Sequence, residues 1–149
     1  MNILLCYPAC PQSYWSFHYA LKFIHKRATY PPLGLITVAA MLPDTWPKKL
    51  VDMNVSRLRD KDIAWADYVF ISAMDIQKQS AKEIISRCHA LEKKIVGGGP
   101  LFTCGHDQFP DVTHILCGEG ELTIPAFLAD LTAGHPRHLY TAEGWADLR

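Results

Sequence analysis

The sequence has no excess of charge of either sign. Its 149 residues include 15 Lys and Arg and 15 Asp and Glu, so the formal net charge at pH 7 is zero. Proteins that bind nucleic acid or anionic membrane surfaces usually carry a basic excess. The composition therefore gives no indication of either kind of partner, and we expect no nucleic-acid binding.

Long apolar runs and a disulfide pattern are also missing. The longest apolar run, Leu33–Leu42, is well short of the roughly 20 residues that cross a bilayer. No signal peptide precedes the first apolar segment, which begins at Ile3. The five cysteines are odd in number and scattered, which is typical of reduced thiols. We therefore expect one cytoplasmic domain without a membrane span.

The motifs that define several familiar chemistries are absent. A dinucleotide site needs GxGxxG after the first strand, and a P-loop needs GxxxxGK followed by Ser or Thr. The chain has CYPAC at residues 6–10, and it has no GxSxG nucleophile elbow. The clustered carboxylates of a receiver domain are missing as well, because Asp75 stands alone after the third strand. We assign no catalytic acid, base or nucleophile.

The cysteines and histidines do not form a recognisable metal motif. Cys6 and Cys10 have the spacing of the first two ligands of CxxxCxxC, but the third position is Ser13. An iron–sulfur cluster needs thiolates, so we interpret Cys6 as a core residue and Cys10 as incidental. Cys104 and His106 do not reach the four ligands of a structural zinc site. No metal ligand is therefore assigned.

The most informative stretch is IVGGGPLF, at residues 95–102. It has the pattern of a buried strand that runs into three glycines and a proline. Three residues without a Cβ allow a large ligand to lie against the backbone. In a parallel sheet, ligands bind outside the carboxyl ends of the strands. This stretch therefore predicts a binding site, although an ordinary tight turn is the simpler alternative.

Short apolar strands alternate with helical segments along the chain. This alternation predicts an α/β, flavodoxin-like (Rossmann-like), doubly wound parallel sheet of five strands in the order 2-1-3-4-5. A further edge strand is expected at His138–Thr141. The predicted strands are Asn2–Tyr7, Leu50–Val51, Tyr68–Ser72, Lys94–Val96 and Thr113–Cys117. The predicted helices are Leu33–Leu42, a short one at Asp60–Ala66, an amphipathic one with Ala81, Ile84, Ile85, Cys88 and Leu91 on one stripe, and a last one that ends near Ala133.

Two segments are expected to cover a surface. The helix Leu33–Leu42 is apolar on all sides, which indicates burial on more than one of them. The connection at residues 8–30 is long for a compact domain, and connections of this length are usually functional. Its aromatic residues favour a cover over a disordered tether. They are Tyr14, Trp15, Phe17, Tyr19 and Phe23, with His18 among them.

Small residues dominate the predicted strand ends. Ser72, the glycines at 97–99 and those at 118 and 120 leave room for a large ligand along the carboxyl edge. Glu119 and Glu121 can accept hydrogen bonds from amides or sugar hydroxyls. The alternatives are that Ser72 is a turn residue and that Glu121 is an acid favoured at a helix N-terminus.

The motifs together resemble those of one family, the N-terminal cobalamin-binding domains of cobalamin-dependent radical S-adenosylmethionine (SAM) enzymes. The residues that carry the resemblance are Tyr30–Leu35, Val51–Val55, Asp67–Met74, Gly97–Thr103 and Gly118–Glu121. They span nearly the whole chain and occur in the family's order. The chain is most similar to the branch that includes the hopanoid methylases.

The resemblance implies where cobalamin would bind. Its nucleotide tail would enter a crevice beside Ser72 and Gly97–Gly99, and the corrin would lie over the carboxyl edge of the sheet. In many cobalamin domains a DxHxxG motif supplies a histidine to cobalt, and this motif is absent here, so His18, Tyr14 and Met74 are the candidates to approach the lower face. The expected cofactor-binding residues are Tyr7, Pro8, Ser72, Ala73, Met74, Gly97, Gly98, Gly99, Pro100, Gly118, Glu119, Gly120 and Glu121.

The resemblance also implies a larger protein. The chain has no CxxxCxxC, so the iron–sulfur cluster and SAM are expected only in a C-terminal radical SAM domain that is missing here. We expect residues 1–134 to form the cobalamin domain and residues 135–149 to form an edge strand and the start of a linker. The whole enzyme would be a methyltransferase that acts on an unactivated carbon, with the missing domain facing the helix that starts at Leu33.

Three other functions are left open by the sequence. The chain could act alone as a cobalamin carrier or sensor. It could also be a flavodoxin-like domain for a flavin or nucleotide, which predicts a phosphate-binding loop after the first strand. The segment Pro8–Pro11 argues against this second function because two of its residues have no N–H. The third alternative is a scaffold that binds nothing, in which the glycines serve only as turns.

Overall fold

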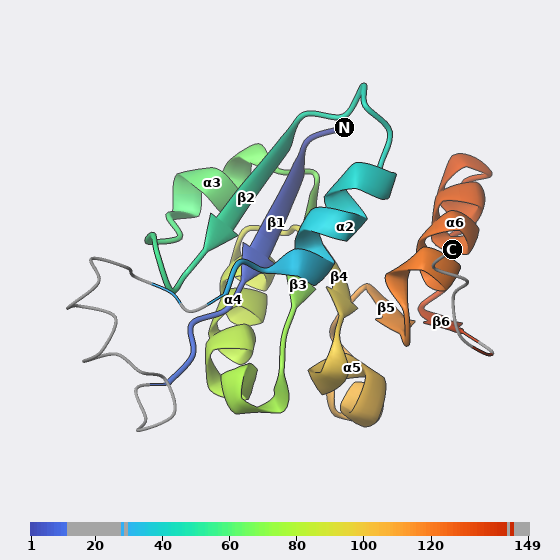
Figure 1. Ribbon diagram of the computed structural model, residues 1–149. Helices are drawn as coiled ribbons and strands as arrows, with labels where there is room; N and C mark the ends of the chain where they lie inside the picture. The colour runs from blue at the N-terminus through green and yellow to red at the C-terminus, as the bar shows by residue number, and fades with distance from the viewer. Residues whose placement is uncertain (12–27, 29, 143, 145–149) are drawn as a thin grey trace.

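The structure is a computed structural model that describes residues 1–11, 28, 30–142 and 144. One parallel sheet of six strands runs through the domain in the order β2-β1-β3-β4-β5-β6 (Figure 1). The strands are β1 (Ile3–Tyr7), β2 (Lys48–Asp52), β3 (Tyr68–Ser72), β4 (Lys94–Gly98), β5 (His114–Cys117) and β6 (Leu139–Thr141). This confirms the predicted fold class and strand order, together with the additional edge strand.

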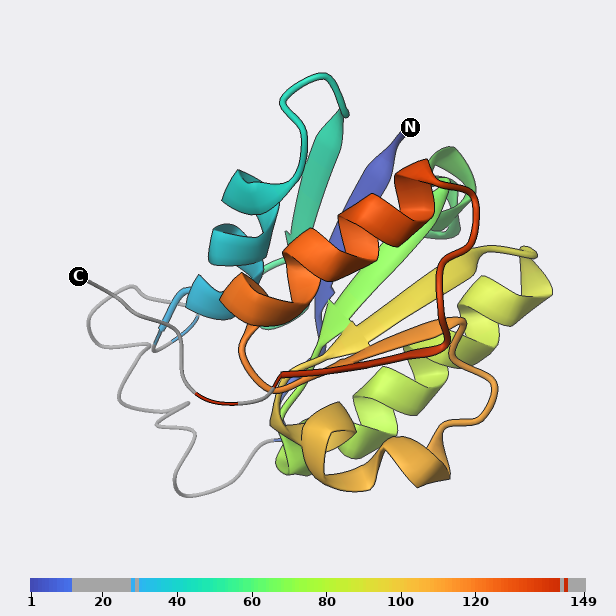
Figure 2. The same cartoon turned by 90° about the vertical axis from the view of Figure 1, so that its right-hand side faces the viewer.

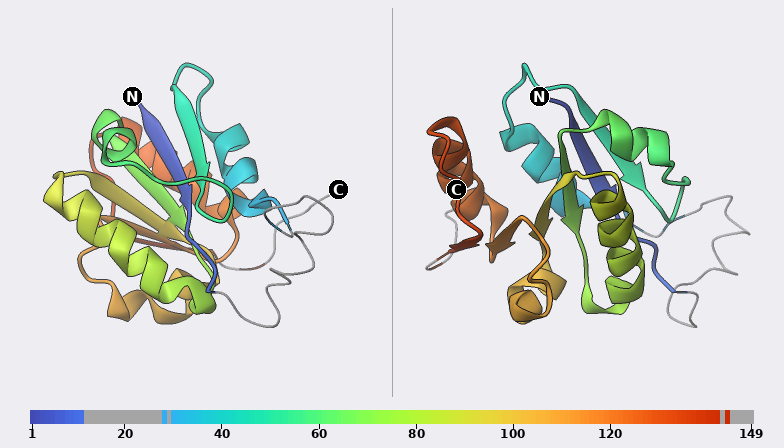
Figure 3. Two further views of the ribbon diagram at one scale, coloured as in Figure 1. Left: turned by 90° about the vertical axis from the view of Figure 1, so that its left-hand side faces the viewer. Right: turned by 180° about the vertical axis from the view of Figure 1, so that it is seen from behind.

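The helices form a layer on each side of the sheet (Figures 2 and 3). One layer holds α2 (Leu33–Met41) and α6 (Gly120–Thr132). The other holds α3 (Asp60–Trp65), α4 (Lys78–Ala90) and α5 (Pro100–Gly105), with the 3-10 turns η2 (Asp75–Gln77) and η3 (His106–Gln108). This doubly wound arrangement follows from right-handed crossovers between parallel strands.

Alternation along each strand separates two apolar cores. In β3, Tyr68 and Phe70 pack beneath α2 and α6, whereas Val69 and Ile71 face the α4 and α5 layer. A strand that is buried on both faces must be apolar at successive positions. The continuous apolar runs in the sequence therefore correctly predicted the central strands.

Two of the glycines in the triple-glycine stretch belong to β4 and not to a turn. Gly97 pairs with Ile71 and Ile115, and Gly98 pairs with Ser72 and Leu116. The predicted strand therefore ended two residues too early, because glycine has a low preference for strands. The helix α5 that follows was not predicted. It starts at Pro100, a residue that is favoured in a first helical turn.

Helix α2 has the predicted position but is not buried all round. It starts after Pro32 and ends before Pro43, which cannot continue the helical hydrogen bonding. Leu35 is buried against the sheet, whereas Leu33 and Ile36 are 66% and 44% exposed. The aromatic residues that were expected to cover this side lie outside the described residues. They are Tyr14, Trp15, Phe17, His18, Tyr19 and Phe23.

A buried histidine, His114, lies in β5, and its side chain faces the layer that holds α6. The ring of His114 is 5% exposed and stacks on Tyr68, with the ring centroids 5.9 Å apart. Its Nδ1 lies 2.6 Å from the carbonyl oxygen of Arg137, which can only accept, so Nδ1 carries the proton. Burial lowers the pKa of His114, because the imidazolium is poorly solvated there.

We expect His114 to make stability depend on pH. Its folded-state pKa is lowered, so the stabilisation is present above about pH 6.5, the pKa of an unfolded histidine, and is lost as the pH falls. One such proton contributes a slope of at most about 1.4 kcal/mol per pH unit. Urea unfolding at pH 7.5 and 5.5 should show a smaller pH dependence in His114→Asn than in the wild type. The exposed His106 is the control, and His106→Asn should keep the wild-type dependence. Equal dependence in all three proteins would contradict this prediction.

Candidate functional site

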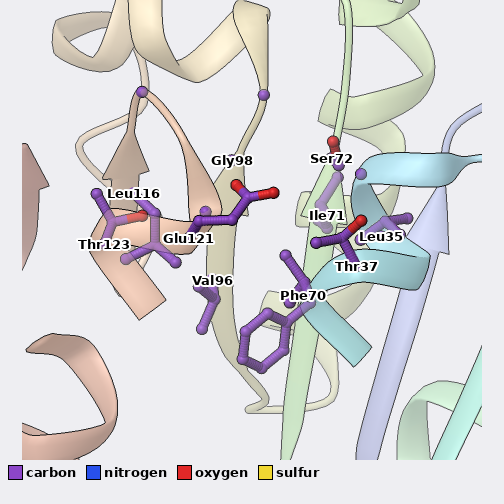
Figure 4. A pocket seen from close by; sticks show the side chains of 15 residues that line it. Leu35, Thr37, Phe70, Ile71, Ser72, Val96, Gly98, Leu116, Glu121 and Thr123 are labelled. Carbon is purple, nitrogen blue, oxygen red and sulfur yellow. The ribbon is translucent and has the colours of Figure 1, made fainter. Parts of the chain in front are cut away.

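A cavity of about 150 Å³ opens at the carboxyl edge of the sheet, between α2 and α6 (Figure 4). Its floor is formed by side chains of the central strands, among them Phe70, Val96 and Leu116. Helix α2 forms one wall and the first turn of α6 forms the other. A dry cavity of this size with an aliphatic lining holds one benzene molecule, so this one can accept an aromatic ring.

About half of the predicted cofactor-binding residues line this cavity. Those that do are Ser72, Gly98, Gly99, Gly118, Gly120 and Glu121. The others lie at the same edge of the sheet but outside the cavity lining. They are Tyr7 at the end of β1 and Pro8 after it, Ala73 and Met74 after β3, Gly97 in β4, Pro100 in α5, and Glu119 before α6. Met74 is 41% exposed, whereas His18 and Tyr14, the other candidates for the lower face of cobalt, fall in the part of the chain that is not described.

The three consecutive glycines have three different roles. A Cβ on Gly97 would lie 2.8 Å from the ring of Phe102, so Gly97 allows α5 to pack against the sheet, away from the cavity. A Cβ on Gly98 would meet only the carbonyl oxygen of Leu116, at 3.8 Å, and this position faces the cavity. Gly99 has φ +84°, and a Cβ there would lie 2.8 Å from Ser72 Oγ. Gly98 is therefore the residue whose missing side chain leaves space for a ligand.

The glycines after β5 bring α6 close to α2. Gly118 has φ +92°, a conformation that residues with a Cβ rarely adopt, and its N–H donates to Thr103 Oγ1 at 3.0 Å. A Cβ on Gly120 would lie 3.3 Å from Val38 in α2. The two helices therefore approach closely at the cavity wall because residue 120 has no side chain.

The loop after β1 is fixed by side chains from neighbouring elements. Gln77, which is 1% exposed, donates from Nε2 to the carbonyl oxygen of Pro8 at 2.6 Å and accepts from the N–H of Met74 at 2.9 Å. The N–H of Ala9 donates to Ser80 Oγ, and that of Cys10 donates to Asn54 Oδ1. The loops after β1, β2 and β3 are thus connected through hydrogen bonds.

This arrangement argues against a phosphate site after β1. A phosphate-binding loop needs free backbone N–H groups. In this loop Pro8 and Pro11 have none, and the N–H groups of Ala9 and Cys10 are already paired with side chains. The alternative of a flavin or nucleotide bound in this way is therefore disfavoured.

The two cysteines of the incomplete motif are not poised to be ligands. Cys6 is fully buried in the core next to α4, as its interpretation as a core residue predicted. Burial raises the pKa of the Cys10 thiol above its usual value near 8.5, so it remains protonated at neutral pH. Among the described residues, no group of three or more His, Cys, Asp or Glu side chains is arranged to hold a metal ion. The same part of the chain contains no helix with the length and apolar character to cross a membrane.

The cavity changes from polar to apolar with depth. Figure 4 shows the oxygens of Ser72, Thr37 and Glu121 on the side nearer the carboxyl edge, with Phe70 and Val96 farther in. Glu121 is exposed and Ser72 and Thr37 are half-buried, whereas Phe70 and Val96 are 3% and 1% exposed. The cavity therefore suits a ligand with a polar end outside and an aromatic end inside.

The sequence did not predict the contribution of α2 or of the strand interiors. Gly34, Leu35, Thr37 and Val38 form the α2 wall. Reasoning from strand ends considers only the loops that follow the strands, and α2 lies over the sheet because of its crossover connection. A signal was present in the segment Tyr30–Leu35, which contributed to the family resemblance.

Comparisons with known proteins identify the family of this chain. A family model described as "B12 binding domain" matches residues 24–128. An uncharacterized methyltransferase of Synechocystis sp. is 35% identical over 99% of this chain and 28% of its own length. The hopanoid C-2 methylase of Rhodopseudomonas palustris is 32% identical over 99% of this chain and 29% of its own length.

The chain therefore spans less than a third of the length of these two relatives. A solved structure, the N-terminal domain of a hypothetical protein of Thermotoga maritima, aligns at a TM-score of 0.48 with 14% identity, over 76% of this chain and 90% of its own. That likeness is too distant to bear on function. The family match covers well over half of the chain and includes both walls of the cavity. The chain therefore belongs to the B12-binding domain family.

Proposed function

We propose that the cavity between α2 and α6 receives the nucleotide tail of cobalamin, and that the corrin lies over the carboxyl edge near the loops after Tyr7, Ser72 and Gly118. The observation that carries this proposal is the polarity of the cavity, which has three oxygen-bearing side chains at its mouth and an apolar floor. A nucleotide tail that enters base first has the matching polarity, with its sugar and phosphate outside. Burial of the base against the apolar floor would supply much of the binding free energy.

The residues around the cavity fit distinct parts of this ligand. The space above Gly98 would take the base, because the position has no side chain. The exposed carboxylate of Glu121 and the hydroxyl of Ser72 are placed to bond to ribose hydroxyls or amide groups. The ordered loop at Pro8–Cys10, together with Met74, would face the corrin. When bound, cobalamin would supply a cobalt centre able to carry a methyl group, and this chain would bind and orient it.

We further propose that the chain is the cobalamin-binding module of a longer methyltransferase. The names of both relatives, a methyltransferase and a methylase, support a methyl transfer, and their greater length supports further domains. In this proposal residues 1–134 form the cobalamin domain, residues 135–149 add the edge strand and lead to a linker, and a C-terminal radical SAM domain holds the iron–sulfur cluster and SAM. The reaction would methylate an unactivated carbon, and the compartment would be the cytoplasm.

A titration with hydroxocobalamin tests the binding proposal. Purified protein is mixed with increasing cofactor, and the bound fraction is measured by ultrafiltration and visible absorption. We expect saturable binding together with a spectral change that reports the departure of the benzimidazole from cobalt, since the tail cannot coordinate cobalt while it occupies the cavity. Absence of binding at high micromolar cobalamin would contradict the proposal for this chain.

A further inference from the structure

The floor of the α2–α6 cavity offers a base almost no hydrogen-bonding partner. Phe70, Val96, Leu35 and Leu116 are apolar and each at most 5% exposed. Thr123 is the one buried polar side chain in the described lining, and its hydroxyl donates to the carbonyl oxygen of Glu119 at 3.0 Å, so towards a ligand it can only accept. A base inserted this deeply would therefore meet mostly hydrocarbon and no side-chain donor.

Much of the backbone around the floor belongs to the sheet. The parallel ladder that joins β3, β4 and β5 places Phe70 next to Val96 and Gly98 next to Leu116. The carbonyl oxygen of Gly98 accepts from the N–H of Ala73, and the N–H of Gly118 donates to Thr103. Among the side chains of the described lining, the hydroxyls of Ser72 and Thr37 and the carboxylate of Glu121 are available to the ligand, and they lie at the mouth (Figure 4).

From this chemistry we propose that the cavity selects corrinoids by the base of their nucleotide tail, taking a benzimidazole or a phenol and rejecting a purine. The inference rests on the proposed function, because it requires the tail to enter the cavity. A phenolic base has no ring nitrogen, and a benzimidazole has one free ring nitrogen once it has left cobalt. Adenine adds further ring nitrogens, which can only accept and would lose water without finding a side-chain donor in the floor.

The expected discrimination is large enough to measure. One unpaired polar group in a buried site costs at least several-fold in affinity, and adenine would bury more than one. We therefore expect adeninylcobamide to bind at least about tenfold more weakly than cobalamin, and p-cresolylcobamide to bind within about threefold of cobalamin.

The test compares four corrinoids on the same protein: cobalamin, p-cresolylcobamide, adeninylcobamide and cobinamide, which has no nucleotide tail. Each dissociation constant is corrected for the separately measured fraction of that corrinoid whose base has left cobalt, because only that fraction can enter the cavity. We expect cobalamin and p-cresolylcobamide to bind most tightly, and adeninylcobamide and cobinamide to bind much more weakly.

The other outcomes separate the two proposals. If adeninylcobamide binds as tightly as cobalamin and both bind much more tightly than cobinamide, the base enters the cavity but is not selected, and only this inference is wrong. If all four bind equally, the tail does not enter the cavity, and the proposed geometry fails together with the inference. If none binds, the proposed function itself is contradicted, and the inference falls with it.

A pair of matched variants adds a second test. Val96→Thr places a hydroxyl in the floor at nearly constant volume, and it should reduce the preference for cobalamin over adeninylcobamide by several-fold. Val69→Thr makes the same change in β3 on the opposite face of the sheet, where Val69 is also fully buried. It should lower stability similarly and leave the preference unchanged. Equal preferences in the two variants would contradict the selection by the floor.

Discussion

Replacement of Gly98 by leucine is expected to abolish cobalamin binding without unfolding the protein. The position lies in β4 and faces the cavity, and a Cβ there meets only the Leu116 carbonyl oxygen at 3.8 Å. The leucine side chain would occupy much of a cavity of about 150 Å³, so the base could not enter. An aromatic group of this kind buries roughly 150 Å² or more, which at about 25 cal/mol per Å² is worth several kcal/mol. The dissociation constant should therefore rise by at least about 100-fold.

The unfolding temperature of the variant serves as the control for this prediction. Glycine is unfavourable within a strand, and Gly98 is the last residue of β4, so Gly98→Leu should unfold at the same temperature as the wild type or slightly above it. Gly98→Ala adds only the Cβ, for which there is room, and should change the affinity by no more than a few-fold. The proposed cavity would be the wrong site if Gly98→Leu still bound cobalamin with wild-type affinity.

Replacement of Gln77 by leucine is expected to have the largest effect on stability. Its amide joins the loops after β1 and β3 through the 2.6 Å bond to Pro8 and the 2.9 Å bond from Met74. Leucine is similar in size but makes neither bond, so the N–H of Met74 loses its partner and Pro8 keeps only the 3.3 Å bond from Asn54. With about 1–3 kcal/mol for the unpaired Met74 N–H and about 1 kcal/mol for the lost bond to Pro8, we expect a loss of about 2–4 kcal/mol in the free energy of unfolding.

Binding should weaken in the same variant. The loops that Gln77 joins lie at the edge proposed to face the corrin. In the variant these loops would be less ordered, and ordering them on binding would cost free energy. We expect cobalamin affinity to fall by about tenfold under conditions in which the variant is still folded. The control is Gln79→Leu, an exposed position in α4, for which urea unfolding should differ from the wild type by less than about 0.5 kcal/mol. A similarly small effect of Gln77→Leu would show that the loops are held by other contacts.

The sheet was predictable because its strands follow a local rule. Strands such as Tyr68–Ser72 are buried on both faces and must be apolar throughout, and the crossovers between them are right-handed. The edge strand β2 was predicted as Leu50–Val51 and extends to Lys48–Asp52, because Lys48 and Lys49 resemble loop residues when read alone. Edge strands tolerate such charges because one side is open to solvent.

The position of the cavity was predictable, but its full lining was not. Small residues at strand ends indicated the carboxyl edge, and five of them line the cavity: Ser72, Gly98, Gly99, Gly118 and Gly120. Residues of α2 that are 30 or more positions away from β3 in the sequence line it as well. The hydrogen bonds made by the Gln77 amide were not predictable, because the bond to Pro8 joins residues 69 positions apart. A hydrogen bond across that separation leaves no periodic trace in the sequence.

The sequence by itself determined the order of the strands, the sheet edge at which the cavity opens and the family to which the chain belongs. These properties depend on local apolar patterns and on short motifs, which are readable residue by residue. The tertiary structure alone decided that Gly97 accommodates Phe102, that Gly98 opens the cavity and that Gly99 makes the turn. Successive residues of a strand point to opposite faces, so the role of each glycine depends on what the fold places on its side of the sheet.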